Sequence, residues 1–123
     1  MVEHRDEGSG TVHGLTLAAV LCTLLLALLL VAQAGIATHR AAKAADLAAL
    51  AAADVARGLR PGIPCEEAAR VAGENGAEVA ACAVLEPERT SVDVTAAIEL
   101  PPPLTALGPA RGVSRAGPPP GEP

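Results

Sequence analysis

This 123-residue chain contains three cysteines, two of which are spaced so that they could form a disulfide bond. Cys65 and Cys82 lie 17 positions apart, whereas Cys22 lies inside a long apolar run. A disulfide between Cys65 and Cys82 would stabilise a small module by roughly 3 kcal/mol in the chain-entropy model, and an extracytoplasmic location would permit it. We expect this disulfide, with two free thiols as the alternative. Cys22 is expected to act as a small apolar side chain.

The polar residues predict neither a metal site nor a catalytic set. His4, His13 and His39 are far from the cysteine pair, so we expect no tetrahedral metal site. Glu66 and Glu67 are adjacent on a predicted helix, point to different sides and cannot form an acid–base pair. No serine has a histidine and an acid placed as triad partners: Ser9, Ser91 and Ser114. We therefore expect no enzymatic activity and no cofactor.

The composition argues against nucleic-acid binding. The net charge is −5, which disfavours a phosphate backbone. The chain has no Phe, Trp or Tyr to stack on bases. The string Gly8-x-Gly10 superficially suggests a nucleotide loop, but it has no preceding strand and no third glycine at the required offset.

An uncharged segment at residues 14–38 is long enough to cross a bilayer. It holds 25 residues, whose polar members are Thr16, Thr23, Gln33 and Thr38. A helical span needs about 20 apolar residues. A buried helix of a soluble domain is a poor alternative, because so short a chain without aromatic residues cannot wrap it. We predict a transmembrane helix, with the lipid bilayer as its partner.

Three fates are open for this segment. Signal peptidase could cut it, because Ala32-x-Ala34 precedes Gly35, although the head before the span carries a net negative charge where such signals are positive. The segment could remain as a plain anchor. A prepilin-type peptidase could instead cut between Gly8 and Ser9 and leave the helix in place.

The remainder of the chain predicts an α+β fold. Alanine is the best helix former, so the helix is expected to continue over residues 9–57 and to stop at Gly58. Residues 58–100 are expected to form a small head, with a short helix that begins near Pro64 and a β-hairpin. Proline and glycine dominate residues 101–123, which are expected to be a disordered tail.

Several stretches resemble a known family: RDEGSGTVHGLTLAAVL, HRAAKAADLAALAAADVARG, CEEAARVAGENGAEVAACAV and SVDVTAAIEL. Over roughly residues 5–100 the chain is similar to the small actinobacterial TadE-like proteins, relatives of the TadE/TadG pseudopilins of the tight-adherence (Flp) pilus machinery. The resemblance implies a pilin-like helix after a short cytoplasmic leader at residues 1–8. It also implies a prepilin-type peptidase and other pilus-assembly or pseudopilin subunits as partners of that helix. Type IVb prepilins typically carry Glu five residues after the cut glycine, where this chain has His13.

The two signals for membrane topology disagree. Arg5 is the one basic residue before the span, whereas Arg40 and Lys43 follow it closely, which by itself places the C-terminal side in the cytoplasm. The resemblance and the cysteines imply the opposite, a single-pass protein of the cell membrane whose C-terminal part is extracytoplasmic. We expect a pseudopilin-like structural or assembly component of a tight-adherence pilus or a type II-like secretion system. The alternative is a small secreted binding module released after Ala34.

Overall fold

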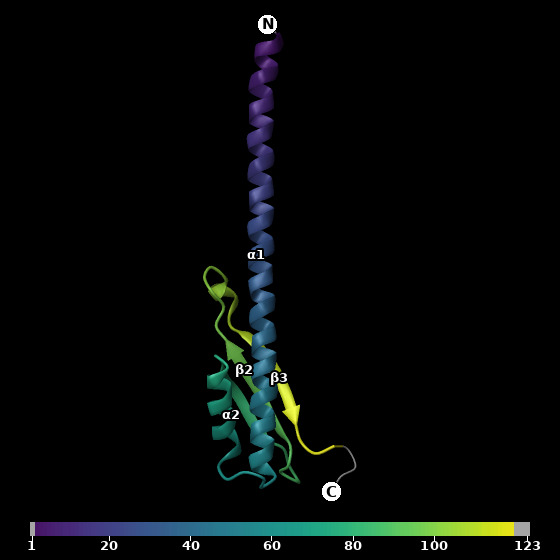
Figure 1. Cartoon of the computed structure of the whole chain (residues 1–123), viewed down its shortest axis with the longest axis vertical. Helices are drawn as coiled ribbons and strands as arrows, with labels where there is room; N and C mark the ends of the chain where they lie inside the picture. Colours follow the sequence, from purple (N-terminus) through teal and green to yellow (C-terminus); the bar gives the residue numbers. More distant parts are fainter. Residues whose placement is uncertain (1, 120–123) are drawn as a thin grey trace. The chain divides into compact units, whose positions relative to one another are not determined.

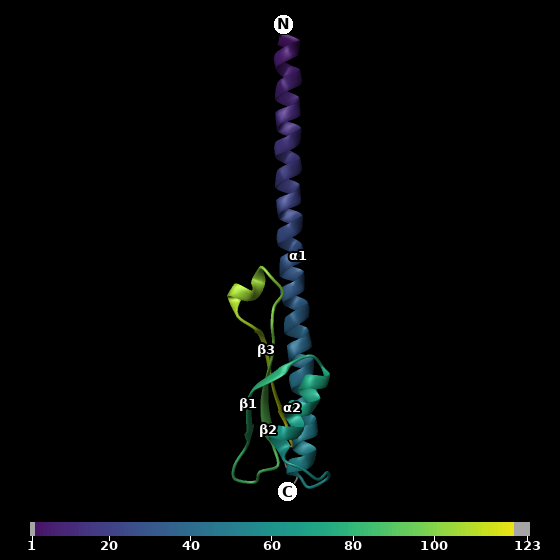
Figure 2. The ribbon, with the colours of Figure 1, turned by 90° about the vertical axis from the view of Figure 1, so that its left-hand side faces the viewer.

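The computed structural model describes residues 2–119, with side chains from residue 8 onward, and confirms the α+β class (Figures 1 and 2). Contacts divide the chain into two units, Met1–Gln33 and Ala34–Pro123. The last four residues of the predicted tail, 120–123, lie outside the described part. The elements in chain order are α1 (Val2–Ala56), α2 (Pro64–Glu74), β1 (Glu78–Val84), β2 (Val92–Ile98), the 3-10 helix η1 (Leu104–Leu107) and β3 (Ala110–Ala116).

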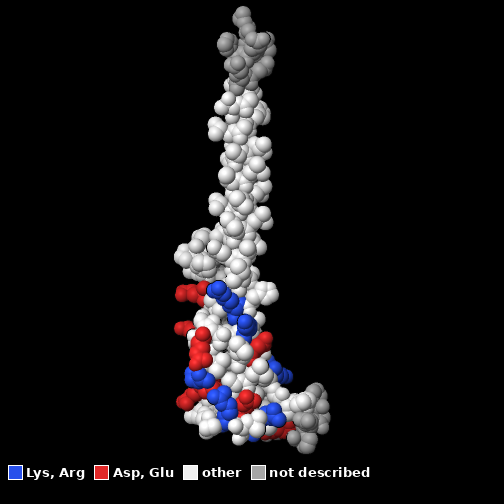
Figure 3. All heavy atoms as spheres, viewed as in Figure 1, with Lys and Arg blue, Asp and Glu red and all other residues white. Residues whose placement is uncertain are grey.

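The described side chains of the first unit are uncharged and face outward from α1 (Figure 3). Leu15, Leu28 and Val31 are 68%, 67% and 70% exposed. The hydroxyl groups of Thr16 and Thr23 donate to carbonyl oxygens four residues earlier, both at 2.8 Å, so these polar atoms are satisfied within the helix. Here α1 is long and apolar enough to be a candidate membrane span.

The second unit has two layers, with both helices on one face of an antiparallel sheet (Figure 2). The strand order is β1-β2-β3, so each strand pairs with its neighbour in the sequence. The central strand, β2, buries Val92, Val94 and Ala96, while Asp93 and Thr95 between them lie on the opposite face. The predicted alternation of this strand is confirmed.

The third strand, β3, corrects the sequence-based expectation of a disordered tail from residue 101. It pairs with β2 over its whole length, so the sheet extends beyond the predicted hairpin. Its inward positions, Ala110, Gly112 and Ala116, are buried, whereas Arg111 and Arg115 point outward. The inward residues are all small, so the period-2 pattern carries almost no hydrophobic signal in the sequence.

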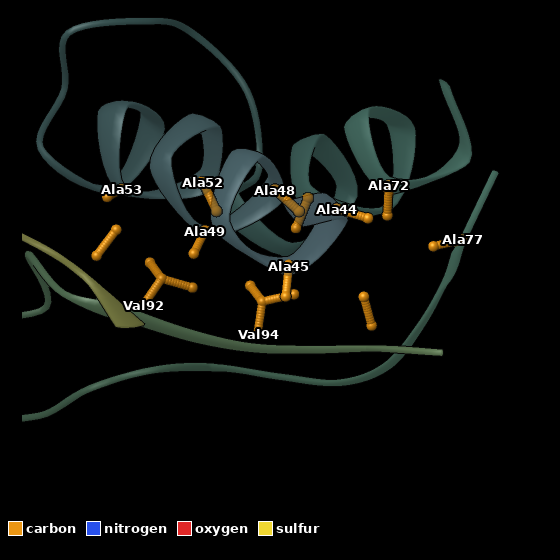
Figure 4. Packing of buried hydrophobic residues seen from close by; sticks show 13 residues of the cluster. Ala44, Ala45, Ala48, Ala49, Ala52, Ala53, Ala72, Ala77, Val92 and Val94 are labelled. Atoms are coloured by element: carbon orange, nitrogen blue, oxygen red, sulfur yellow. The ribbon is translucent and has the colours of Figure 1, made fainter. Parts of the chain in front are cut away.

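The core consists of alanine and valine. Val92 and Val94 are its largest fully buried side chains. Figure 4 shows these two valines facing alanines of α1 across the space between helix and sheet. The α1 alanines recur every three or four residues, which places them on one helix face: Ala37, Ala41, Ala44, Ala45, Ala48, Ala49, Ala52 and Ala53.

Gly112 lies where the backbone of β3 approaches the backbone of α1. A Cβ atom added to Gly112 would lie 2.3 Å from the backbone nitrogen of Ala42 and 2.4 Å from its Cα. Neither atom belongs to a side chain that could rotate away. The strand therefore requires glycine here in order to reach the helix.

We predict that Gly112→Ala lowers the free energy of unfolding of the head by about 1–3 kcal/mol, because the new methyl group must push strand and helix apart. Amide hydrogen exchange of β2, measured on the full chain in detergent micelles, reports this opening free energy. The matched control is Gly73→Ala on α2, where the added Cβ meets no atom within 4 Å. The control should stabilise the head by up to about 1 kcal/mol, and equal effects of the two substitutions would contradict the close approach.

Candidate functional site

The predicted disulfide between Cys65 and Cys82 is present, which confirms that expectation. Cys65 is the second residue of α2, and Cys82 lies on the helix-facing side of β1, with the two Cα atoms 5.8 Å apart. Ala68 and Ala72 of α2 are fully buried behind the bond. The disulfide therefore attaches the short helix to an edge strand, where Ala68, Ala72 and the partly buried Val71 are the apolar side chains of α2 in the core.

The surface of α2 carries an ion-pair network instead of an acid–base site. Arg70 donates to both carboxylate oxygens of Glu67, at 2.5 and 3.1 Å, and also to Glu74. Arg60 lies 3.4 Å from Glu67. The hydrogen bond from Arg70 lowers the pKa of Glu67, which favours the ionised form of this carboxylate. Glu66 faces solvent.

The outer face of the sheet carries a cross-strand pair. Asp93 of β2 lies directly opposite Arg115 of β3, and the guanidinium donates to its two oxygens at 2.6 and 2.9 Å. The hydrogen bond from Arg115 lowers the pKa of Asp93. Because the folded pKa lies below the unfolded one, the pair stabilises the head at neutral pH, and this stabilisation is lost as the pH falls through the lowered pKa.

Both candidate cleavage sites lie within α1. Ser9 follows Gly8 there, and Nδ1 of His13 donates to the Ser9 carbonyl oxygen at 2.7 Å. Ala32, Ala34 and Gly35 also lie in α1, just ahead of Ala37, the first buried residue among the described side chains of this helix. Cleavage after Ala34 would therefore remove none of the side chains that are described as buried.

The remaining candidate residues are not brought together. Cys22 is exposed on the apolar part of α1. Among the described residues, no group of three or more His, Cys, Asp or Glu could hold a metal ion. Ser91 lies close to Gly117, at the end of the sheet, while Ser114 lies on β3.

Sequence reasoning missed the segment that contains η1, because its prolines predicted disorder. The segment borders a hollow of about 460 Å³ whose polar side chains are Glu78, Glu99 and Thr105. Two carboxylates without a basic partner among the lining residues form no recognisable catalytic arrangement. The one signal for order was the pair of leucines, Leu104 and Leu107, between the prolines and the following glycine.

No protein-family model, curated protein or solved structure matches this chain. Its function must therefore be inferred from the exposed apolar helix and the cross-linked head.

We predict that replacing both cysteines by alanine, in Cys65→Ala with Cys82→Ala, lowers the free energy of head unfolding by about 3 kcal/mol, because the unfolded chain regains the freedom of the closed loop. Hydrogen exchange of β1 and β2 in the full chain measures the change. Cys22→Ala is the control and should leave the exchange unchanged. An intact mass that does not rise by two hydrogen atoms on reduction would show that the bond is absent.

Proposed function

We propose that this chain is a bitopic, pseudopilin-like component of a tight-adherence pilus or a type II-like secretion system. Its N-terminal helix anchors it in the cell membrane, and the head stands on the extracytoplasmic side. One observation carries the proposal: a single helix, α1, supplies both an uncovered apolar span and the alanine face on which the head is built.

The exposed span supports the anchor. In water, side chains such as Leu15, Leu28 and Val31 would expose a long apolar surface, whereas acyl chains accept such surface at no cost. The helix also satisfies its own backbone and threonine hydroxyl groups, as a helix surrounded by lipid must.

The disulfide supports an extracytoplasmic head. Structural disulfides persist in oxidising compartments and are rare in the cytoplasm, and Cys65–Cys82 is the bond that holds α2 to the sheet. Arg40 and Lys43, next to the span, favour the reverse orientation. We give the disulfide more weight, because it cross-links α2 to the sheet of the head.

The resemblance to TadE-like proteins supplies the proposed partners, which are other pilus-assembly or pseudopilin subunits. Outside the span, α1 still exposes Leu47 and Leu50, at 39% and 57%, on the part of its surface that the head leaves uncovered. These two leucines offer a neighbouring helix an apolar contact in the aqueous compartment.

The position of the core also favours a second candidate, the secreted binding module. Since the first buried residue of α1 is Ala37, a chain that begins at Gly35 would keep the whole core and the disulfide. The two candidates therefore differ in the fate of residues 1–34, and not in the fold of the head.

The mature N-terminus separates the candidates. We predict that the protein purified from membranes of its own cells begins at Ser9, and that Gly8→Leu preserves the full-length mass while Ala34→Leu changes nothing. Intact-mass spectrometry of the membrane and medium fractions measures this. A soluble product that begins at Gly35, and that is lost in Ala34→Leu, would contradict the proposal and establish the secreted module.

The same cells test the proposed assembly. A photoreactive residue at position 50 should form adducts with other subunits of the apparatus. One at position 113 on the sheet serves as the control, because Val113 is more exposed than Leu50, at 73% against 57%. A protein that begins at Ser9, stays in the membrane and yields no adduct specific to position 50 would be an anchor without a role in assembly.

A further inference from the structure

We propose that the η1 loop, defined as residues 100–110, is a second membrane contact that rests on the lipid surface where the span ends. This inference rests on the membrane anchor proposed above. It assigns a lipid-binding role to the one described segment of the head that carries no charged residue and has its own apolar cluster.

The loop lies beside the last turn of the predicted span. Ala37, within the uncharged segment 14–38, is buried together with Leu100 and Ala110, and Leu104 packs against this group. Within the second unit, Figures 1 and 2 both show the yellow-green loop at the end where that unit's part of α1 begins. A helix that leaves the bilayer near residue 38 therefore brings the loop to the membrane surface.

The loop presents apolar atoms to its surroundings. Its sequence, LPPPLTALGPA, has Thr105 as its one polar side chain. Leu107 is 75% exposed, the largest value for any large apolar side chain among the described residues. Burial of one such leucine in the interface is favourable by roughly 1.5–3 kcal/mol, and several neighbouring apolar groups make a surface contact of the kind that monotopic proteins use.

The backbone of the loop is suited to a poorly hydrated environment. Four of its residues are prolines, which have no N–H to leave unpaired. The N–H of Leu104 donates to the Pro101 carbonyl at 2.9 Å, and that of Gly108 donates to the Thr105 carbonyl at 3.1 Å. The prolines and these two hydrogen bonds therefore reduce the number of N–H groups that lose a water partner when the loop meets lipid.

Charged residues set the depth of this contact. Glu99 and Arg111 bracket the loop in the sequence. The close approach of Gly112 to Ala41 and Ala42 places the start of β3 at the level of Arg40 and Lys43. In Figure 3 the blue and red spheres of the head begin beneath the loop. Basic side chains at this level can meet lipid phosphates, while Glu78 and Glu99 beside the loop prevent deeper entry.

The absence of aromatic residues makes a sharp test available. A single tryptophan is the only strong fluorophore in each of three full-length variants: Leu107→Trp in the loop, Val113→Trp on the sheet and Val20→Trp in the span. Val113→Trp is the matched control for Leu107→Trp, because the two native side chains are 73% and 75% exposed. Each oxidised variant is reconstituted into vesicles of phosphatidylcholine and phosphatidylglycerol, with and without phosphatidylcholine brominated near the ester end of its acyl chains.

We expect bromolipid to remove about half of the emission of Leu107→Trp and to leave Val113→Trp unchanged, with Val20→Trp quenched as proof of insertion. Aqueous iodide should quench Val113→Trp and not Leu107→Trp. If Val20→Trp is quenched and Leu107→Trp behaves like Val113→Trp, the loop contact is overturned and the anchor stands. Protection of Leu107→Trp from both quenchers would show a protein neighbour, such as a second copy, and would also overturn it. If Val20→Trp escapes bromolipid, the anchor and the loop contact fail together.

Discussion

The structure depends on the close contact between the alanine face of α1 and the sheet. Val92 and Val94 meet only methyl groups on the helix, and Gly112 leaves β3 without a side chain where it touches the Ala42 backbone. Small side chains bury little area each, but they let main-chain atoms approach closely and gain dispersion contacts along the whole interface. Any added volume on either surface separates the two layers, so this core tolerates enlargement poorly.

This kind of core explains the remaining features of the head. With no aromatic residue, α2 packs on the core through two small alanines, Ala68 and Ala72, and the partly buried Val71, and the disulfide to β1 adds a covalent constraint. From residue 8 onward, the first buried residue of α1 is Ala37. Before it, the described helix offers leucines and valines that no described residue covers, and we propose that lipid covers them. In this proposal one helix serves two environments, and the change between them coincides with the end of the uncharged segment.

Much of this arrangement could be predicted from the sequence, because its signals were local. The uncharged run predicted the span, alanine predicted the long helix, the alternation around Val92 and Val94 predicted a strand, and the cysteine spacing indicated the disulfide. The third strand could not be predicted, since Ala110, Gly112 and Ala116 are too small to produce a hydrophobic pattern and the preceding prolines are typical of disorder. Its order depends on the long-range contact with α1, which no local pattern records. The η1 loop was missed for the same reason.

The most direct test of the central claim is flotation of membranes from cells that make the full chain, after an alkaline wash that strips peripheral proteins. If lipid surrounds residues 14–38, the chain rises through the density gradient with the lipid and is released only by detergent, with the span still present in its intact mass. A chain that retains residues 14–38 and remains at the bottom as a soluble protein would contradict the account.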